Sequence, residues 1–438
     1  MPTAMSCTSG LMFSTMTFLA RLVAVALLLS SPRVFASETP VATETTPQLA
    51  NYYELIYQIR VVARKAGSKS SIGSGFQVSA DGLIVTNFHV VAGAVNSPDS
   101  HRIEYLDQSG NSGELLLLDF DVVNDLALLR HPTPAERHFQ VETAEVAKGA
   151  MLYALGNPHD LGVTLKQGAF NGYVEHSYDR QILFSGSLNP GMSGGPSLLA
   201  DGRVVGVNVA TAGSDLSFLV PAEAVASLIA TDRALDSGDY SAEIARQLLA
   251  WQQGRYDDLL ARDWQRVEFA DWSALGELRN DMQCWGRSNE DDDEITVVSV
   301  SKGCDAANRL YLGDSFSSGH IHYSFSMEQA VDLSTWRFHR TRTHNMYPDN
   351  SGDDTQLTNM TCHSQFLRVA SPDADDNQVQ ASICTRAYVE MPGLFDVLLL
   401  ATQREEDQVY SAHFSLAGIS REIADAFTVK FLTTLGWQ

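Results

Sequence analysis

Short apolar runs alternate with turn-forming residues along much of the chain, most densely between about residues 53 and 230. The runs are rich in β-branched and aromatic residues and are separated by Gly, Asn and Pro, as is typical of short strands joined by tight turns. This pattern predicts an all-β barrel or sandwich, which we place at residues 51–232. The clearest runs are residues 75–78, 83–87, 115–118, 127–129, 151–155 and 204–210.

A helical pattern follows the strands and is interrupted once, at Gly254. Apolar residues three and four positions apart predict one face of a helix on each side of this glycine. Because glycine often marks a turn, we predict a helical hairpin over residues 233–266 that links two domains. The apolar positions are Ile244, Leu248, Trp251, Tyr256, Leu259 and Leu260.

The remainder of the chain, residues 267–438, returns to alternating polar and apolar positions. Such alternation favours antiparallel strands, and a final helix is indicated by Ser420 as its N-cap and Gly436 just past its end. We therefore predict an α+β C-terminal domain of unknown function. Its strand-like runs are residues 294–300, 320–325, 379–388 and 409–416, and its helical face carries Ile423, Phe427, Phe431 and Leu435.

Composition narrows the function classes. The 438 residues include 44% hydrophobic residues, enough for two buried cores, and carry a formal net charge of -23. A surplus of negative charge repels phosphate backbones, so nucleic acid is not an expected partner. We also expect no membrane span to remain after removal of the N-terminal signal described next.

The N-terminus has the layout of an export signal. Arg21 opens the apolar run 22–29, and small residues lead to Ala36. We predict a signal peptide over residues 1–36, a flexible lead-in over residues 37–50, and a periplasmic or secreted protein. The alternative is an uncleaved N-terminal anchor.

Four cysteines follow the signal. In an oxidising compartment an even number of cysteines indicates disulfides, and we favour the two pairs that are closest in sequence. The alternative is four free, buried thiols in a cytosolic protein. The favoured pairs are Cys284 with Cys304 and Cys362 with Cys384.

Three short segments carry candidate chemistry. In the first, an Asp-Gly turn and a strand are followed directly by His89, so its imidazole can face a cleft at a strand end. A single histidine is more often structural, and this one gains weight only from the other two segments.

The second segment is Asn124-Asp125 followed by the apolar run 126–129. A carboxylate beside a buried strand needs a partner, and Asp125 could accept a hydrogen bond from the His89 imidazole and fix its tautomer. A carboxylate that caps a turn is the simpler alternative. Asp119 and Asp121 are competing candidates for the histidine partner.

The third segment is Gly191-Met192-Ser193-Gly194-Gly195. Clustered glycines allow backbone N–H groups to turn toward one point, as an oxyanion hole requires. With Ser193 as nucleophile, we predict an oxyanion hole in the segment Gly191, Met192 and Ser193, with the amides of Gly191 and Ser193 as donors. An ordinary Gly-Ser turn is the alternative.

Taken together, the three segments resemble the trypsin-like serine peptidases, and specifically their HtrA-type branch, over residues 72–229. The order His, Asp, Ser matches that family. The resemblance implies an all-β fold of two six-stranded antiparallel barrels with the site between them, and a serine endopeptidase that works through an acyl-enzyme. It also implies that His89 is general base and acid, Asp125 orients it, and Ser193 attacks the substrate.

The sequence departs from this family at two places. Met192 stands where Asn or Asp commonly precedes the nucleophile, and we expect its side chain to alter substrate contact. No Gly-Leu-Gly-Phe-like segment follows the protease region, so the domain at residues 267–438 replaces the family's PDZ domain.

The family position of the primary specificity pocket gives further expectations. Ser187 is expected to form its floor, and Asn208, Val209 and Ala210 one wall. No acid stands at the floor, so a small or medium apolar side chain is expected in preference to Lys or Arg.

Other functions stay open at this point. A non-catalytic binding or chaperone-like module on a protease fold is the main alternative, and a cell-envelope binding role of the C-terminal domain is another. We expect protein or peptide substrates, no cofactor and no metal. Homo-oligomers are possible through Tyr52, Tyr53 and Tyr57, although aromatic clusters are more often core. Weaker metal patterns are His320 and His322 with His339, His344 or His363, and a calcium-loop-like run at Asp373, Asp375 and Asn377.

Overall fold

The structure is a computed structural model. It describes residue 49 and residues 51–437, except 158–160, 212–214, 232, 293–294, 307–308, 342–355 and 372–373. The predicted signal peptide lies outside the described residues, and of the predicted lead-in only Leu49 is described. Residues 45–438 form one compact unit. No helix in the described part of the chain combines the length and apolar composition needed to cross a bilayer.

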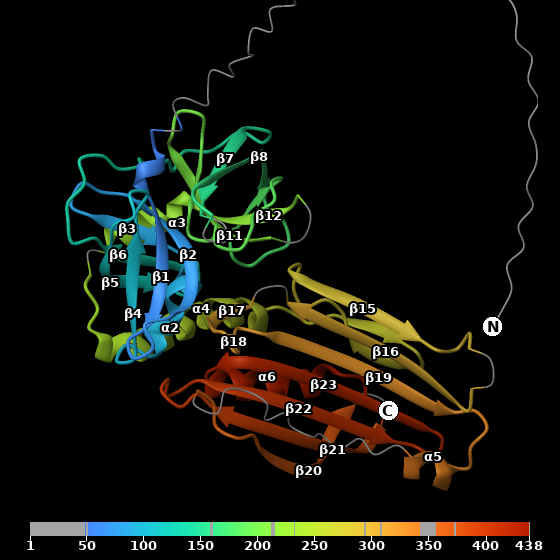
Figure 1. The fold of residues 1–438 in the computed structure, drawn as a ribbon. Coiled ribbons are helices and arrows are strands. Elements are labelled where there is room, and N and C mark those ends of the chain that lie inside the picture. The colour runs from blue at the N-terminus through green and yellow to red at the C-terminus, as the bar shows by residue number, and fades with distance from the viewer. Residues whose placement is uncertain are drawn as a thin grey trace, which may run out of the picture. The chain divides into compact units, whose positions relative to one another are not determined.

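The first barrel closes in the strand order β1-β2-β3-β6-β5-β4 (Figure 1). The predicted apolar runs supply its interior, since alternate residues of each strand face inward. Helix α2 (Phe88–Asn96) leaves the barrel at the end of β3. The strands are β1 (Ile56–Ala63), β2 (Lys69–Gln77), β3 (Leu83–Thr86), β4 (His101–Leu106), β5 (Ser112–Asp121) and β6 (Leu126–Arg130), after a 3-10 turn η1 (Tyr53–Leu55).

The second barrel also closes on six antiparallel strands, in the order β10-β11-β12-β9-β8-β7. The prediction of a double six-stranded barrel is therefore confirmed. Helix α3 (Ala222–Ala230) follows its last strand. The strands are β7 (Met151–Gly156), β8 (Thr164–Tyr173), β9 (Ile182–Phe184), β10 (Pro196–Leu198), β11 (Val204–Thr211) and β12 (Ser217–Pro221).

The predicted helical hairpin is wrong, because one continuous helix, α4 (Tyr240–Ala261), follows the short turn η3 (Ser237–Asp239). Gly254 lies inside α4, where a glycine costs about 1 kcal/mol relative to alanine. Burial on one side of the helix offsets that cost, since Leu248 and Leu259 on either side of Gly254 are fully buried. The absence of a side chain also leaves room for the Tyr178 hydroxyl, which would lie 3.4 Å from an added Cβ.

The C-terminal domain is built on a seven-stranded antiparallel sheet in the order β15-β16-β19-β23-β22-β21-β20 (Figure 1). Helix α6 (Arg421–Thr434) packs on it, as predicted, with the Ser420 hydroxyl accepting a hydrogen bond from the Ile423 amide at 3.3 Å. Two hairpins and helix α5 (Thr335–Thr341) complete the domain. The sheet strands are β15 (Met282–Ser288), β16 (Val297–Ala306), β19 (Ile321–Ala330), β20 (Thr361–Ser371), β21 (Ala374–Ala387), β22 (Phe395–Arg404) and β23 (Gln408–Ile419), and the hairpins are β13 (Arg266–Phe269) with β14 (Trp272–Leu275) and β17 (Leu310–Gly313) with β18 (Phe316–Ser318).

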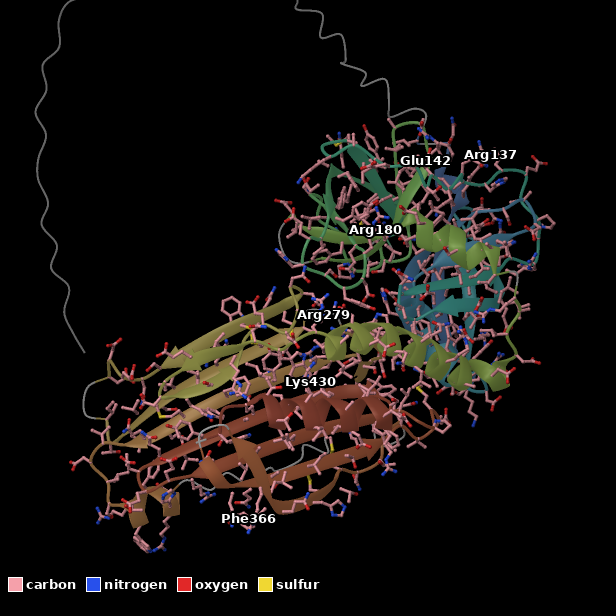
Figure 2. All side chains as sticks on the ribbon, turned by 180° about the vertical axis from the view of Figure 1, so that it is seen from behind. Arg137, Glu142, Arg180, Arg279, Phe366 and Lys430 are labelled. Carbon is pink, nitrogen blue, oxygen red and sulfur yellow. A yellow bond between two sulfur atoms is a disulfide. The ribbon has the colours of Figure 1, made fainter. Side chains whose placement is uncertain are left out.

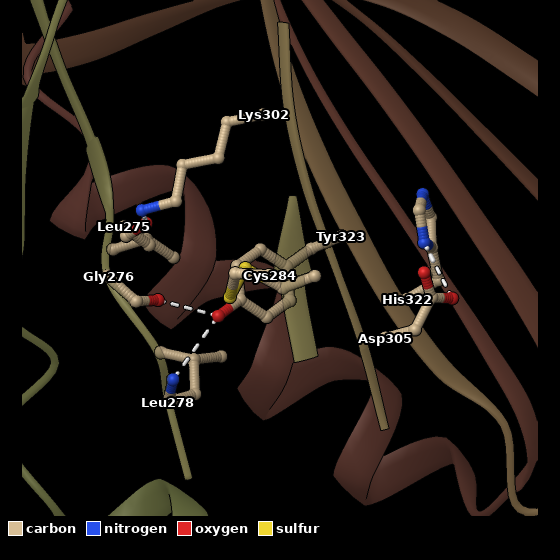
Figure 3. Close-up of a disulfide and its surroundings, with 9 residues drawn as sticks. Leu275, Gly276, Leu278, Cys284, Lys302, Asp305, His322 and Tyr323 are labelled. Carbon is tan, nitrogen blue, oxygen red and sulfur yellow. Dashed lines mark hydrogen bonds and ion pairs between the residues drawn. A yellow bond between two sulfur atoms is a disulfide. The ribbon is translucent and has the colours of Figure 1, made fainter. Parts of the chain in front are cut away.

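Both predicted disulfides are present, Cys284–Cys304 and Cys362–Cys384. Each joins directly opposed residues of neighbouring strands, β15 with β16 and β20 with β21, so each ties an edge strand to the sheet. Figure 3 shows the first of them beside Tyr323, whose hydroxyl donates to the Gly276 carbonyl at 2.5 Å. The sheet edges are thus covalently fixed.

Helix α4 contacts both the first barrel and the C-terminal domain. Toward the barrel, Arg233 pairs with Asp119 of β5 at 2.9 Å and with Glu243 of α4 at 3.1 Å. Toward the C-terminal domain, Arg255 of α4 lies 3.7 Å from Asp281, and Arg279, labelled in Figure 2, lies 3.9 Å from Asp258 of α4. Ion pairs therefore hold this helix on both sides.

Candidate functional site

His89 lies in the first turn of α2, two residues after Asn87, and Asp125 faces it from the turn between β5 and β6. The backbone of Asp125 has a positive φ of 53°, which is uncommon for a residue other than glycine. Its carbonyl accepts hydrogen bonds from the Phe88 amide at 3.1 Å and from the Asn87 side chain at 2.8 Å. These bonds hold Asp125 in a conformation that aims its carboxylate at α2.

The carboxylate of Asp125 holds both the ring and the backbone of His89. Its Oδ2 lies 2.6 Å from Nδ1 of the imidazole, and its Oδ1 accepts from the His89 amide at 2.8 Å. Burial disfavours the charged imidazolium, but the charge of Asp125 and its hydrogen bond outweigh this effect and hold the pKa of His89 above its ordinary value. A proton on Nδ1 leaves Nε2 free to act as a base.

The competing acids have other partners. Asp119 is fully buried and pairs with Arg233, and it also accepts from the Thr231 hydroxyl at 2.7 Å. Asp121 accepts from the amides of Val123 and Asn124, so it caps the turn that leads to Asp125. Among the three acids, Asp125 is the one that the described structure places against His89.

The segment around Ser193 forms a tight turn on the second barrel. The Met192 amide donates to the Asn189 carbonyl at 3.0 Å, and Gly191 has a φ of 94°, as the third position of a type II turn requires. Gly194 also has a positive φ, of 84°, and a Cβ there would lie 2.2 Å from the Ser74 carbonyl oxygen. The glycines are therefore needed both for backbone conformation and for close packing.

Ser74 of β2 ties this turn to the first barrel, and the sequence reasoning gave it no role. Its amide donates to the Ser193 carbonyl and its hydroxyl to the Gly191 carbonyl, each at 2.7 Å. The same hydroxyl accepts from the Asn157 amide at 2.9 Å. The Gly73-Ser74-Gly75 run was a signal for a close backbone approach, since a Cβ on Gly73 would lie 3.1 Å from the Ser193 carbonyl oxygen.

These contacts bring the two halves of the predicted site together at the junction of the barrels. Gly194, next to Ser193, lies against Thr86 and Asn87. Gly73 lies against both Val90, next to His89, and Ser193. The Ser193 hydroxyl donates to the Val209 carbonyl of β11 at 2.9 Å, so in this structure it is turned toward β11.

Both amides predicted as oxyanion donors lack a hydrogen-bond partner within the part of the chain that the structure describes. Among the described residues, neither the Gly191 amide nor the Ser193 amide makes a hydrogen bond, whereas the Met192 amide is bonded within its own turn. The Met192 amide, which was not among the predicted donors, is used by the turn that positions Gly191.

The expectation that Met192 alters substrate contact is also wrong. Its side chain is fully buried and packs in the core of the second barrel, against Gly156. Met192 therefore supports the turn from inside.

The prediction that the Asn208 side chain forms part of the pocket wall is also wrong. Its side chain is fully buried and donates to the carbonyls of Leu155 at 2.8 Å and Met192 at 3.2 Å, so it braces the barrel interior. Val209 and Ser187 are partly exposed, while the side chain of Ala210 lies outside what the structure describes. Only the backbone of Asn208 can face a substrate.

The residues considered for an oligomer contact or a metal site make other contacts in the structure. Tyr57 is buried in the first barrel, Tyr52 stacks on Phe139 with 5.1 Å between ring centroids, and Tyr53 packs on the same core as Tyr52.

His322 lies 2.9 Å from Asp305 (Figure 3). His413, rather than His339 or His363, joins it, with 5.6 Å between the ring centroids. Of the other residues in these patterns, His344 and Asp373 lie outside the described residues.

Burial lowers the pKa of His320 and of His413 to about 4, with nearby positive charge as a lesser cause. No group of three or more His, Cys, Asp or Glu side chains that could hold a metal ion occurs in the described ranges.

Comparison with known proteins agrees with this geometry. Residues 73–207 match the family described as trypsin-like peptidase domain. This stretch of the chain is a trypsin-like peptidase domain. The mitochondrial serine protease HTRA2 of Bos taurus is 35% identical over 163 residues, which cover 35% of this chain and 34% of that protein. The chloroplastic protease Do-like 1 of Arabidopsis thaliana is 30% identical over 173 residues, which cover 36% of this chain and 38% of that protein.

Among solved structures, the active form of the Rv3671c protease from M. tuberculosis has 23% sequence identity and a TM-score of 0.39, over 43% of this chain and 86% of that one. The chain spans about a third of the length of the curated relatives it matches. For the peptidase domain, the resemblance to HtrA-type proteases is confirmed.

Proposed function

We propose that the chain is a serine endopeptidase in which Ser193 is the nucleophile, His89 the general base and acid, and Asp125 the group that orients His89. The observation that carries this proposal is the pair of hydrogen bonds between the Asp125 carboxylate and the ring and amide of His89. They lie at the junction of the barrels, where the Ser74 amide bonds to the Ser193 carbonyl. The matched peptidase family supports the same reaction class.

In the proposed reaction the Ser193 hydroxyl first turns from the Val209 carbonyl toward Nε2 of His89. Its oxygen attacks the scissile carbonyl carbon while its proton passes to Nε2, and the carbonyl oxygen becomes an oxyanion. The proton then goes to the leaving amine as the peptide bond breaks, which leaves an ester on Ser193. Water, activated by His89 in the same way, releases the acid product.

The electrostatics suit this sequence of steps. Asp125 favours the imidazolium that exists between the two proton transfers, in agreement with the raised pKa of His89. The amides of Gly191 and Ser193, which have no hydrogen-bond partner among the described residues, would donate to the oxyanion, and loss of one such donor typically lowers kcat by about 10² to 10³. Met192 and Asn208 keep these amides in place from the interior of the barrel.

For substrates, we propose proteins or peptides with a small or medium apolar residue before the cleaved bond. Ser187 would form the floor of the pocket, and the backbone of Asn208 with Val209 one wall. The proposed floor residue, Ser187, carries no negative charge that would pair with a Lys or Arg side chain of the substrate. Cleavage of a peptide library tests this preference, and cleavage predominantly after Arg would contradict it.

We further propose that the protein acts outside the cytoplasm, in the periplasm or after secretion. The two disulfides support this location, because such bonds persist in oxidising compartments. Detection of the protein in cell fractions, with free thiols counted after denaturation, tests it.

The decisive experiment compares the protein with Ser193→Ala in casein hydrolysis and in labelling by a fluorophosphonate probe. We expect wild type to cleave and label, and the variant to lose about 10⁶ in kcat and all labelling. Ser70→Ala, an exposed serine on β2, should label like wild type. A wild type that neither cleaves nor labels would favour the non-catalytic binding module instead.

A further inference from the structure

The hairpin β17–β18 of the C-terminal domain packs on the helix that carries His89. Leu310, Leu312 and Phe316 of the hairpin are buried in the same apolar cluster as Phe88 and Val90 of α2. Alternate residues of a strand point to opposite sides, so Tyr311 projects away from the face shared by Leu310 and Leu312. One continuous core therefore joins this hairpin to the first barrel.

Polar contacts fix the hairpin on α2 and on α4. The Asn96 side chain, at the end of α2, donates to the Leu312 carbonyl at 2.7 Å. At the base of the hairpin, Arg255 of α4 donates to the Gly319 carbonyl at 2.7 Å. Gly319 has a φ of 77°, and a Cβ there would lie 2.7 Å from the Trp251 ring. The hairpin is thus held at both ends.

Tyr311 contacts the imidazole of His89 from this fixed hairpin. The two ring centroids are 6.0 Å apart and the ring planes meet at 79°, an edge-to-face arrangement. The Tyr311 hydroxyl donates to Asp314 at 2.7 Å, so the tyrosine ring is itself held in place. Asp125 restrains the imidazole at Nδ1, and Tyr311 adds a second restraint on the ring.

Resting on the proposed function, we infer that Tyr311 is a positioning residue for His89, so that the C-terminal domain completes the active site of the peptidase domain. The Tyr311 ring limits tilting of the imidazole and covers part of it from water, which keeps Nε2 directed toward Ser193. The effect belongs to the proton transfers and not to substrate binding. It should therefore appear in kcat more than in KM.

The test uses the full-length chain with Tyr311→Ala, Tyr311→Leu and Tyr311→Phe, and measures kcat, KM and melting temperature. An edge-to-face contact of ordinary strength predicts a loss of about three- to tenfold in kcat for the Ala and Leu variants, with KM within about twofold of wild type. Tyr311→Phe keeps the ring and should retain most of kcat. Ser315→Ala, at the exposed tip of the hairpin, serves as control.

Tyr311→Leu keeps apolar bulk and gives a usable result should Tyr311→Ala fail to fold. Unchanged kcat in Tyr311→Leu, a loss confined to KM, an equal loss in Tyr311→Phe, or a gain in activity on removing the ring would each overturn the inference. A wild type that is inactive beside Ser193→Ala would instead remove the proposed function, and the inference with it.

Discussion

The junction of the two barrels and the interior of the C-terminal sheet differ in what they bury. At the junction, Ser74, Thr86, Asn87 and Asn208 are fully buried polar residues that hydrogen-bond to backbone groups. The core of the C-terminal sheet is apolar and contains many aromatic rings, and both disulfides lie in the same domain. The rings include Trp272, Phe325, Phe427, Phe431 and Trp437.

The difference reflects two physical tasks. Hydrogen bonds are directional, so they fix where a backbone turn lies, yet each adds only about 1 kcal/mol of net stability. Apolar burial is non-directional and adds more stability for each side chain. Asn87 shows the cost at the junction, because its Oδ1 is buried without a partner in the described structure. Changes at the junction should therefore reduce activity more than stability, and changes in the sheet the reverse.

The largest effect is expected from Asp125→Asn at the junction. An amide there cannot accept the Nδ1 proton in the same way, so His89 loses the tautomer that leaves Nε2 basic, and kcat should fall by about 10⁴. The measurement is kcat for peptide hydrolysis together with far-UV circular dichroism, which should be unchanged. Asp121→Asn is the control, because Asp121 caps the neighbouring turn, and its kcat should stay within about threefold of wild type.

The pH profiles of the two proteins sharpen this prediction. The neutral form of His89 is the base, and its pKa is raised, so wild-type kcat/KM should be lost as pH falls through a midpoint above 6.5. In Asp125→Asn both causes that raise the pKa are gone, and burial alone lowers it. The midpoint of the residual activity should then lie below 6.5, and an unchanged midpoint would contradict the role of Asp125.

The sheet should respond in the opposite way when the Cys284–Cys304 bridge is replaced by two alanines. The bridge closes a chain segment with a sequence separation of 20, and its loss should lower the free energy of unfolding by about 2 to 4 kcal/mol. Peptidase kcat at low temperature should stay within about twofold of wild type. Chemical denaturation measures the first quantity. A large loss of kcat without loss of stability would break the comparison.

The sequence predicted the disulfide pairs and α6 from local signals, cysteine spacing and a serine cap. Strand alternation indicated only a barrel or sandwich, and the resemblance to the trypsin-like peptidases implied the two six-stranded barrels. It misplaced a turn at Gly254, since a glycine is tolerated inside a helix whose neighbouring residues are buried. It assigned Met192 and Asn208 to the substrate side, because family position gives the location of a residue but not which way its side chain points.

Ser74 and Tyr311 were missed for a different reason. Ser74 acts across the barrel junction, and Tyr311 lies in another domain, next to a Leu312 carbonyl that is bonded to a residue 216 positions earlier. Contacts over such separations depend on the assembled fold. The glycines beside Ser74 indicate a close approach but not its partner, and no local pattern indicates the contact of Tyr311 with His89.

Among the variants that test this comparison, the smallest effect is expected from Ser74→Ala. The variant keeps the backbone bond from residue 74 to Ser193 but leaves the Gly191 carbonyl and the Asn157 amide without the hydroxyl between them. The turn that aims the Gly191 amide should loosen, so kcat/KM should fall by about 10- to 100-fold while stability falls by at most about 2 kcal/mol. Ser70→Ala, on the same strand, loses only a part-buried bond of 3.3 Å to the Val61 carbonyl and should match wild type in both quantities. If Ser74→Ala keeps wild-type kcat/KM but unfolds more easily, the buried polar groups at the junction serve stability after all, and the distinction between the two regions fails.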